Sequence, residues 1–250
     1  MAIEKSVAII GASSGLGLAL AKHFASKGTR VYGTTRDGKD IQVEGVFTSK
    51  LDTSEKRSID ELKIPEIQEL YVVAGYFSKE SFDEMSWEEE LKMYKTGAMG
   101  PLFVTRHLVK QGSLRHGSKV IWITSEAGSI GLRTEKEGGG LYGHHASKTA
   151  QNMNGKLLSF DLKPKGISIV MIHPGFMKTG LTKSVGFDKH YEKGGAIDPE
   201  EAVEPLLKVV ANLTLENTGK FIAPVGPKGV GNAHVLGPVE KLPAPLELPW

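Results

Sequence analysis

The chain has 250 residues, of which 40% are hydrophobic and 24% are charged, with a formal net charge of +2. These values are typical of a folded globular protein, and the length suits one α/β domain, so we expect residues 1–250 to form a single domain. The small charge without a basic block excludes the electrostatic footprint of a nucleic-acid-binding protein, and the lack of cysteine excludes disulfides, thiolate catalysis and cysteine-ligated zinc.

Short apolar segments rich in β-branched residues alternate with amphipathic stretches of helical length. The predicted strands are Val7–Ile10, Arg30–Gly33, Gly45–Thr48, Leu70–Ala74, Lys119–Thr124, Ile167–Ile172 and Gly219–Ile222. Several are almost entirely apolar, as expected for strands covered on both faces. The alternation predicts an α/β fold of the Rossmann type, a doubly wound parallel β-sheet with helices on both faces.

The predicted helices follow from apolar periodicity and from residues that begin or end helices. The first runs over Gly15–Lys27; a second begins after Ser86 and breaks near Gly97; a third continues to about Val109; a long fourth covers His145–Lys163. The segment 225–250 is rich in glycine and proline, so we expect irregular structure there. Its apolar end either packs on the body or a neighbouring subunit, or frays.

No targeting or membrane segment is apparent in the sequence. The first residues lack the order of charged, apolar and cleavable regions that marks a signal peptide. No segment approaches the roughly 18 apolar residues of a membrane span. We therefore expect a cytoplasmic protein with no membrane partner.

Three glycines follow the first predicted strand, in the segment Gly11-Ala12-Ser13-Ser14-Gly15-Leu16-Gly17. Between a strand and a helix, glycines allow a tight turn and let a pyrophosphate approach the backbone. The helix N-terminus directs free N–H groups and a positive dipole end at such an anion. This placement predicts a dinucleotide site.

The end of the second predicted strand indicates which dinucleotide is bound. An acidic residue there would accept hydrogen bonds from the ribose 2′-OH and repel a 2′-phosphate. This chain has Arg36 instead, and a guanidinium suits phosphate as a planar multi-donor group, so NADP(H) is favoured. In the alternative, Arg36 is a solvated surface residue and Asp37 or Asp40 serves NAD.

These features resemble the short-chain dehydrogenase/reductase family, whose landmarks recur in order along nearly the whole chain. The glycine spacing G-x-x-x-G-x-G is the family's, and Ile123-Thr124-Ser125 resembles its catalytic serine segment. The resemblance assigns the remaining cofactor contacts to Asp52, Ala74, Gly75, Lys148, Pro174, Gly175, Met177 and Thr179. Two departures are the Val72-Val73 pair, which replaces two asparagines, and Gly97, which replaces a helix asparagine.

In the family, a serine holds the substrate carbonyl, a tyrosine passes the proton, and a lysine four residues later lowers the pKa of the tyrosine. Ser125 and Lys148 match, but His144 stands at the tyrosine position. Residues four apart share a helix face, so His144 can reach the same site as Lys148, whereas Tyr142 lies about 240° round the helix. Tyr142 remains an alternative relay if Gly143 lets the chain turn before the helix begins.

The exchange of tyrosine for histidine changes the chemistry that we expect. A neighbouring ammonium should lower the pKa of His144 and keep the ring neutral, able to donate only its N–H. The imidazole is also about 2 Å shorter than a phenol, and misplacement by about 1 Å can cost on the order of 10²-fold in rate. No metal is expected at His144, His145 and His173, because adjacent helical histidines diverge by about 100°.

A set of large apolar side chains falls in segments that surround the substrate cleft in this fold. It comprises Tyr76, Phe77, Trp87, Phe176, Met177, Phe187 and Tyr191. If about half of them line the cleft, the small-molecule substrate is bulky and apolar, such as a polyketide-like compound or another secondary metabolite. The other interpretation is ordinary core packing.

The sequence favours an NADP(H)-dependent oxidoreductase that acts on a ketone or secondary alcohol of such a substrate. One alternative is an enzyme of this fold that uses Ser125, His144 and Lys148 for non-redox proton transfer, as an isomerase, cyclase or lyase. The other is a non-catalytic protein that binds the dinucleotide. The resemblance also implies a homodimer or homotetramer, paired through the helices of residues 87–109 and 145–163.

Overall fold

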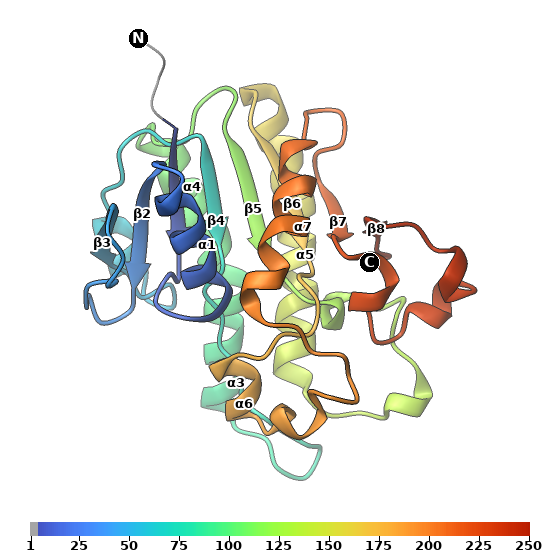
Figure 1. The fold of residues 1–250 in the computed structure, drawn as a ribbon. Coiled ribbons are helices and arrows are strands. Elements are labelled where there is room, and N and C mark those ends of the chain that lie inside the picture. Colours follow the sequence, from blue (N-terminus) through green and yellow to red (C-terminus); the bar gives the residue numbers. More distant parts are fainter. Residues whose placement is uncertain (1–4) are drawn as a thin grey trace.

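The structure is a computed structural model that describes residues 5–250. Its centre is one eight-stranded sheet in the order β3-β2-β1-β4-β5-β6-β7-β8 (Figure 1). The first seven strands are mutually parallel, and only the short edge strand β8 is antiparallel to its neighbour β7. The predicted doubly wound parallel sheet is confirmed.

The seven predicted strands are all present, with ends shifted by a few residues. The strands are β1 (Ser6–Ile10), β2 (Arg30–Thr35), β3 (Val46–Lys50), β4 (Glu69–Val72), β5 (Lys119–Ile123), β6 (Ser168–Ile172), β7 (Lys220–Ala223) and β8 (Leu246–Glu247). β8 was not predicted, because two residues carry no periodic signal. It lies in segment 225–250, which is otherwise loops and 3₁₀ turns, and its Leu246 is buried.

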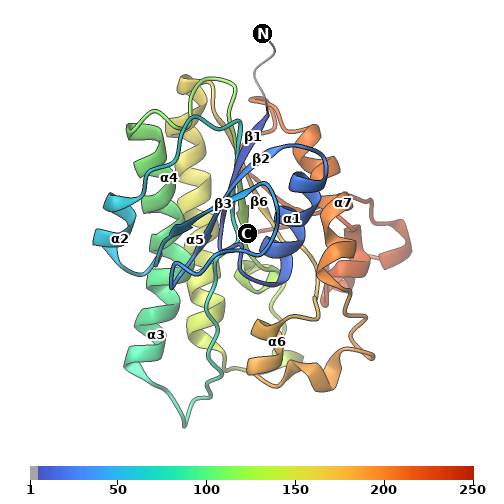
Figure 2. The same ribbon diagram turned by 60° about the vertical axis from the view of Figure 1, so that its left-hand side comes forward.

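Helices cover both faces of the sheet. They are α1 (Gly15–Ser26), α2 (Lys56–Glu61), α3 (Trp87–Tyr94), α4 (Gly100–Lys110), α5 (Tyr142–Leu162), α6 (Gly180–Ser184) and α7 (Pro199–Ala211). Figure 2 shows α1 and α7 on one side of the sheet and α2, α4 and α5 on the other. Alternation along β1 explains the two layers, because Val7 and Ile9 pack with α1 while Ala8 and Ile10 join the opposite core.

The predicted break near Gly97 is wrong. The chain instead continues from α3 into α4 through a π-helical turn, Lys95–Met99. Gly97 is buried there, and a Cβ on it would lie 3.2 Å from Oγ of Ser147 on α5. Asn154 of α5 donates to the Ala98 carbonyl at 3.2 Å, so contact with α5 satisfies one of the backbone groups of the turn.

The order of the strands determines where a ligand can bind. β1 lies between β2 and β4, so the chain crosses in opposite directions on the two sides of β1. The loops that follow β1 and β4 therefore separate at the carboxyl end of the sheet and leave a crevice. That is where the glycine-rich segment and the predicted catalytic residues lie.

Candidate active site

A cavity of about 1080 Å³ opens at the carboxyl ends of the strands. Every cofactor residue predicted from the sequence lines it, as do Ser125, His144 and Lys148. The predicted cofactor residues are Gly11, Ser13, Ser14, Gly15, Leu16, Arg36, Asp52, Ala74, Gly75, Lys148, Pro174, Gly175, Met177 and Thr179. One continuous cavity thus joins the predicted dinucleotide site to the predicted catalytic group.

The glycine-rich turn has the conformation that a pyrophosphate needs. Gly11 and Gly15 adopt positive φ angles of 88° and 51°. A Cβ on Gly17 would lie 1.9 Å from the Gly11 carbonyl oxygen, so only glycine lets α1 begin this close to the turn. The Ser14 side chain makes no capping hydrogen bond, which leaves the first N–H groups of α1 available to an anion. The residues present therefore fit a dinucleotide.

Arg36 follows β2 and lines the cavity, whereas neither Asp37 nor Asp40 is among the lining residues. Asp37 accepts a hydrogen bond from the backbone N–H of Lys39 at 3.2 Å and pairs with the Lys39 ammonium at 3.1 Å. These contacts lower the pKa of Asp37. The alternative in which an aspartate meets the adenosine ribose therefore has no support in the geometry.

Ser125 follows β5 and accepts a hydrogen bond from the backbone N–H of Ala127 at 3.1 Å. This contact uses a lone pair of Oγ and leaves the hydroxyl hydrogen available. A substrate carbonyl oxygen is an acceptor that such a hydroxyl can bind. The position suits the role that family resemblance implies for Ser125.

Lys148 is buried on α5 and its Nζ is held from two sides. It donates to Oε1 of Gln151 at 2.9 Å and to the Ile123 carbonyl oxygen at 3.3 Å. Burial lowers the pKa of Lys148 to about 8. Gln151 was not predicted as a site residue, although its position three residues after Lys148 on a helix places it on the same face.

His144 lies beside Lys148 with its ring stacked on Phe77, at a centroid separation of 4.0 Å. Burial, and then the nearby Lys148 ammonium, lower the pKa of His144 to about 3. The expected neutral ring is therefore confirmed, with burial as the larger cause. Its Nδ1 is buried and has no hydrogen-bond partner among residues 5–250.

Tyr142 is not brought to this site. α5 begins at Tyr142, so the helix already includes this residue and the helical offset from His144 applies. Its ring is exposed and does not line the cavity. The turn that would have aimed Tyr142 inward was expected at Gly143 but is made two residues earlier, at Leu141, which adopts a left-handed conformation with φ of 52°.

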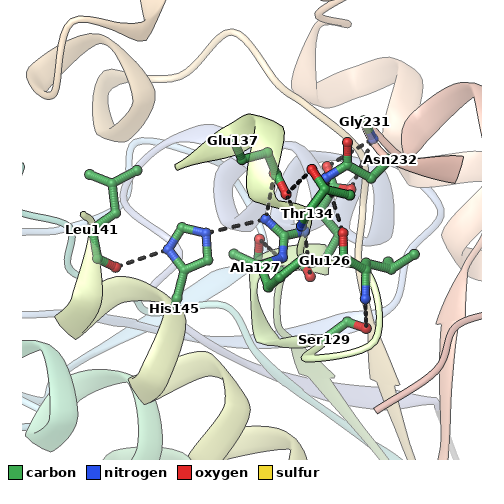
Figure 3. A network of polar contacts seen from close by, with 12 residues as sticks. Glu126, Ala127, Ser129, Thr134, Glu137, Leu141, His145, Gly231 and Asn232 are labelled. Carbon is green, nitrogen blue, oxygen red and sulfur yellow. Dashed lines mark hydrogen bonds and ion pairs between the residues drawn. The ribbon is translucent and has the colours of Figure 1, made fainter. Parts of the chain in front are cut away.

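A polar network borders the cavity beside α5. Figure 3 shows His145 contacting the Leu141 carbonyl oxygen and Glu126 contacting the Gly231 backbone nitrogen. The second nitrogen of His145 lies 3.3 Å from Nη1 of Arg133, so its lone pair accepts and Nδ1 carries the hydrogen. The network ties the turn after β5 to the start of α5.

The candidate metal histidines are engaged elsewhere. Nε2 of His173 lies 2.7 Å from the Gly229 carbonyl oxygen, and the rings of His144 and His145 meet edge to face. Among the described residues, no group of three or more histidine, cysteine, aspartate or glutamate side chains is arranged to hold a metal ion.

Five of the seven large apolar residues noted in the sequence line the cavity, namely Tyr76, Phe77, Phe176, Met177 and Phe187. The other two do not. Trp87 is 78% exposed on α3, and the Tyr191 hydroxyl contacts Thr182 at 2.8 Å. Phe77 contacts both His144 and Phe187, and Phe187 contacts Phe176, so these three phenylalanines give the cavity an apolar wall next to His144.

Comparison with known proteins identifies the family. Residues 5–190 match the model of the short chain dehydrogenase family. An uncharacterised oxidoreductase of Schizosaccharomyces pombe is 31% identical over 242 residues, which cover 85% of this chain and 92% of the relative. The 1-hydroxy-2-glutathionyl-2-methyl-3-butene dehydrogenase of a Rhodococcus species is 28% identical over 224 residues, covering 86% of this chain and 95% of the relative.

Solved structures with this fold include two carbonyl reductases. The enzyme from chicken fatty liver, bound to NADPH, has a TM-score of 0.74 at 24% identity, with 88% of this chain and 96% of that chain covered. Sniffer of Drosophila melanogaster has a TM-score of 0.74 at 21% identity, with 99% of each chain covered. At these identities the likeness establishes the fold.

No helix within residues 5–250 combines the length and hydropathy needed to cross a membrane. The glycine-rich turn, the cavity at the carboxyl edge of the sheet and the match over most of the length all agree. The chain belongs to the short-chain dehydrogenase family of oxidoreductases.

Proposed function

We propose that this protein uses NADP(H) to interconvert a ketone and a secondary alcohol on a bulky, apolar organic molecule, such as a polyketide-like or other secondary metabolite. The observation that carries the proposal is the single cavity shared by Arg36, the glycine-rich turn, Ser125, His144 and Lys148. The Rhodococcus relative, named as a dehydrogenase of a hydroxyl-bearing compound, supports alcohol–carbonyl chemistry.

NADP(H) is favoured over NAD(H) because Arg36 is the charged group at the end of β2 that lines the cavity. The neighbouring Asp37 is already paired with Lys39. The chicken carbonyl reductase and BdcA, two structures of this fold, were both solved with NADPH. A guanidinium in this position would bind a 2′-phosphate through charge-assisted hydrogen bonds.

The bound nicotinamide would supply or accept the hydride. Ser125 would donate its hydroxyl hydrogen to the substrate oxygen, because the Ala127 N–H engages one lone pair of Oγ and leaves that hydrogen available. Lys148 would contact the ribose from its anchored position. Neutral His144 would pass the proton of its N–H to the same oxygen and would take up a proton from water in the cavity at its other nitrogen, as a relay must.

The apolar wall formed by Phe77, Phe176 and Phe187 supports a bulky apolar substrate. Non-redox proton transfer is less favoured, because a histidine with a pKa of about 3 is a weak base at neutral pH. A non-catalytic role would leave the catalytic set Ser125, His144 and Lys148 unused.

The experiment is a titration of the protein with NADPH and with NADH, followed by carbonyl substrates of increasing apolar bulk, monitored by NADPH consumption. We expect tighter binding of NADPH, and turnover that improves with apolar bulk. Arg36→Asp should weaken NADPH binding by about tenfold or more and leave NADH binding nearly unchanged. Lys22→Asp, the same charge change on an exposed residue of α1 outside the cavity, is the control.

Equal affinity of the unmodified protein for the two cofactors would contradict the role of Arg36. Tight NADPH binding without turnover of any of the carbonyl substrates would contradict the redox function and favour the non-redox or non-catalytic alternative. Turnover confined to small hydrophilic carbonyls would overturn the substrate class alone.

A further inference from the structure

The start of α5 is held in an unusual way. Leu141 precedes the helix with φ of 52° and ψ of 35°, a conformation that costs a non-glycine residue on the order of 1 kcal/mol, and its side chain cannot cap a helix. Glu80, from the loop after β4, supplies the missing acceptors. Its backbone carbonyl accepts from the Leu141 N–H at 3.2 Å, and Oε1 of its carboxylate accepts from the Gly143 N–H.

Glu90 approaches the same point from α3. A Cβ on Gly143 would lie 2.7 Å from Oε2 of Glu90 and 2.4 Å from Cε of Met93. Only glycine at position 143 leaves room for a carboxyl group against the backbone of α5. Glu80 is buried, and Glu90 lies on the face of α3 that contacts α5.

One oxygen of each carboxyl group, Oε2 of Glu80 and Oε1 of Glu90, is buried and has no hydrogen-bond donor among the described residues. Glu90 is only partly buried as a residue, but its Oε1, like Oε2 of Glu80, is closed off from solvent. Two interacting carboxyl groups in such a place cannot both ionise without strong repulsion, and a proton shared between them satisfies both oxygens. Burial, then a hydrogen bond to Glu80 and its charge, raise the pKa of Glu90 to about 7, although the Gly143 N–H acts in the opposite direction.

The other titratable group that responds to this pair is Tyr94, also on α3. Its pKa is raised first by burial and then by the charges of Glu90 and Glu80. On α5 the pair meets the Gly143 N–H, and the charges that act on the adjacent His144 come from Lys148, His145 and Arg133. No cation among the described residues forms an ion pair with Glu80 or Glu90 in this structure.

We propose that Glu80 and Glu90 share a proton and together clamp the first turn of α5, so that they act as positioning residues for His144. Glu80 binds the N–H of the left-handed residue, Leu141, and the N–H of Gly143, which directly precedes His144. Figure 3 shows the third restraint, from Leu141 to His145. Loss of the shared proton sets two carboxylates against each other at this turn and loosens it.

The sign of the pH effect follows from the raised pKa. Because the pKa of Glu90 in the folded protein lies above its ordinary value of 4.5, stabilisation by the protonated pair is fully present below pH 4.5. It is lost as the pH rises through about 7. Glu90→Gln keeps an N–H donor opposite Glu80 at every pH and does not titrate, so it imitates the protonated pair.

The first test measures Tm from pH 4.5 to 8.5 for the unmodified protein, for Glu90→Gln and for Glu88→Gln. Glu88 is exposed in the same turn of α3, so its variant controls for the loss of one negative charge. We expect the Tm difference between Glu90→Gln and the unmodified protein to be near zero at pH 4.5 and to become positive by a few degrees above pH 7. A difference that does not change with pH, or that Glu88→Gln reproduces, would overturn the shared proton.

The second test separates positioning from general stability, and this part rests on the proposed function. Glu80→Ala removes the acceptor for the Gly143 N–H, so kcat should fall by about tenfold or more while NADPH affinity stays within about twofold. Glu80→Gln retains an amide oxygen as acceptor and should restore most of the kcat. Equal kcat in Glu80→Ala and the unmodified protein refutes the positioning role.

The two tests fail independently. If the unmodified protein reduces no carbonyl compound, the proposed function is wrong, and the Tm series still decides whether the pair shares a proton. If turnover is present and Glu80→Ala lowers NADPH affinity as much as kcat, the glutamate supports the whole fold, and the positioning role is refuted.

Discussion

At the scale of single residues, the feature that sets this site apart is the imidazole of His144 beside Lys148. A phenol passes a proton from one oxygen, whereas a neutral imidazole must donate from one nitrogen and accept at the other. The ring is stacked on Phe77 and its Nδ1 has no partner among residues 5–250, so its position is determined by packing. Its low pKa follows mainly from the same burial.

His144→Phe should abolish turnover and leave NADPH affinity nearly intact, because the phenyl ring retains the stacking on Phe77 and the imidazole is not needed to hold the dinucleotide. His144→Tyr restores the usual family arrangement and should preserve or raise reductase activity. Steady-state kinetics and fluorescence titration with NADPH measure the two effects. Full activity in His144→Phe would make the residue structural and would point to a bound water as the relay.

Lys148 gives the site a pH dependence of stability with a definite sign. Its pKa falls from 10.5 to about 8 on burial, so the unfolded chain binds more protons between those values. The resulting stabilisation is fully present above about pH 10.5 and is lost as the pH falls through 8. The free energy of unfolding should therefore rise from pH 8 to 10.5 in the unmodified protein relative to Lys148→Met, as denaturant titrations would measure.

The exposed Lys22→Met is the matched control for that comparison, because it removes the same charge from a solvated position on α1. It should leave the slope with pH unchanged. A parallel pH dependence in the unmodified protein and in Lys148→Met would show that Lys148 is not desolvated.

At the scale of elements, two glycines allow helices to pack closely against neighbouring segments of the chain. Gly17 lets α1 begin against the turn after β1, and Gly97 lets the π-helical turn lie on α5. A methyl group at position 17 would collide with the backbone of the turn, whereas one at position 97 would press on Oγ of Ser147 at 3.2 Å. Local propensity does not explain these glycines, since glycine weakens a helix interior.

Gly17→Ala should lower the free energy of unfolding by about 2 kcal/mol or more and weaken NADPH binding, because the new Cβ would lie 1.9 Å from the Gly11 carbonyl oxygen. Thermal unfolding and NADPH titration would measure the two losses. At Gly180 a Cβ would meet nothing within 4 Å, so Gly180→Ala is the control for stability. If the Gly17 variant is as stable as the Gly180 variant, the approach of α1 to the turn is not as close as described.

At the scale of the whole molecule, apolar side chains remain exposed on the helices that were predicted to pair between subunits. They include Trp87 and Leu91 on α3, and Met153, Leu157 and Phe160 on α5. Phe160 is 60% exposed. A face of this kind is typical of a protein–protein interface, so the homodimer or homotetramer stays a prediction with added support.

Sedimentation at micromolar concentration should return a mass of two or four chains. Leu157→Glu combined with Phe160→Glu should shift the protein toward monomer, because buried charges are costly at an interface. Lys183→Glu, on the exposed side of α6, serves as the control for the change in charge. Sedimentation of the unmodified protein as a monomer of about 27 kDa would contradict the prediction.

The sequence by itself determined the sheet and the glycine-rich turn, and it predicted three candidate catalytic residues, Ser125, His144 and Lys148, that the structure brings to one cavity. Local pattern sufficed because buried parallel strands are apolar runs in sequence. The glycines, Arg36 and Ser125 closely follow strands, and Lys148 lies in the second turn of α5, so their positions depend on the elements that carry them. Spacing on a helix also predicted that Lys148 lowers the pKa of His144, but burial, the larger cause, was not predicted. Edge strand β8 and the start of α5 carried no local signal of comparable strength.

Only the tertiary structure decided which tyrosine, aspartate and glutamate side chains lie at the cavity or contact the helix that carries His144. Tyr142 is exposed outside the cavity because α5 begins at that residue. Asp37 also lies outside the cavity, where it pairs with Lys39. The pairing of Glu80 with Glu90 brings the loop after β4 and helix α3 together at the start of α5. The periodicity within one segment does not predict a contact between three segments. Local pattern specifies elements, whereas burial and through-space contact set the protonation and position of the side chains that they carry.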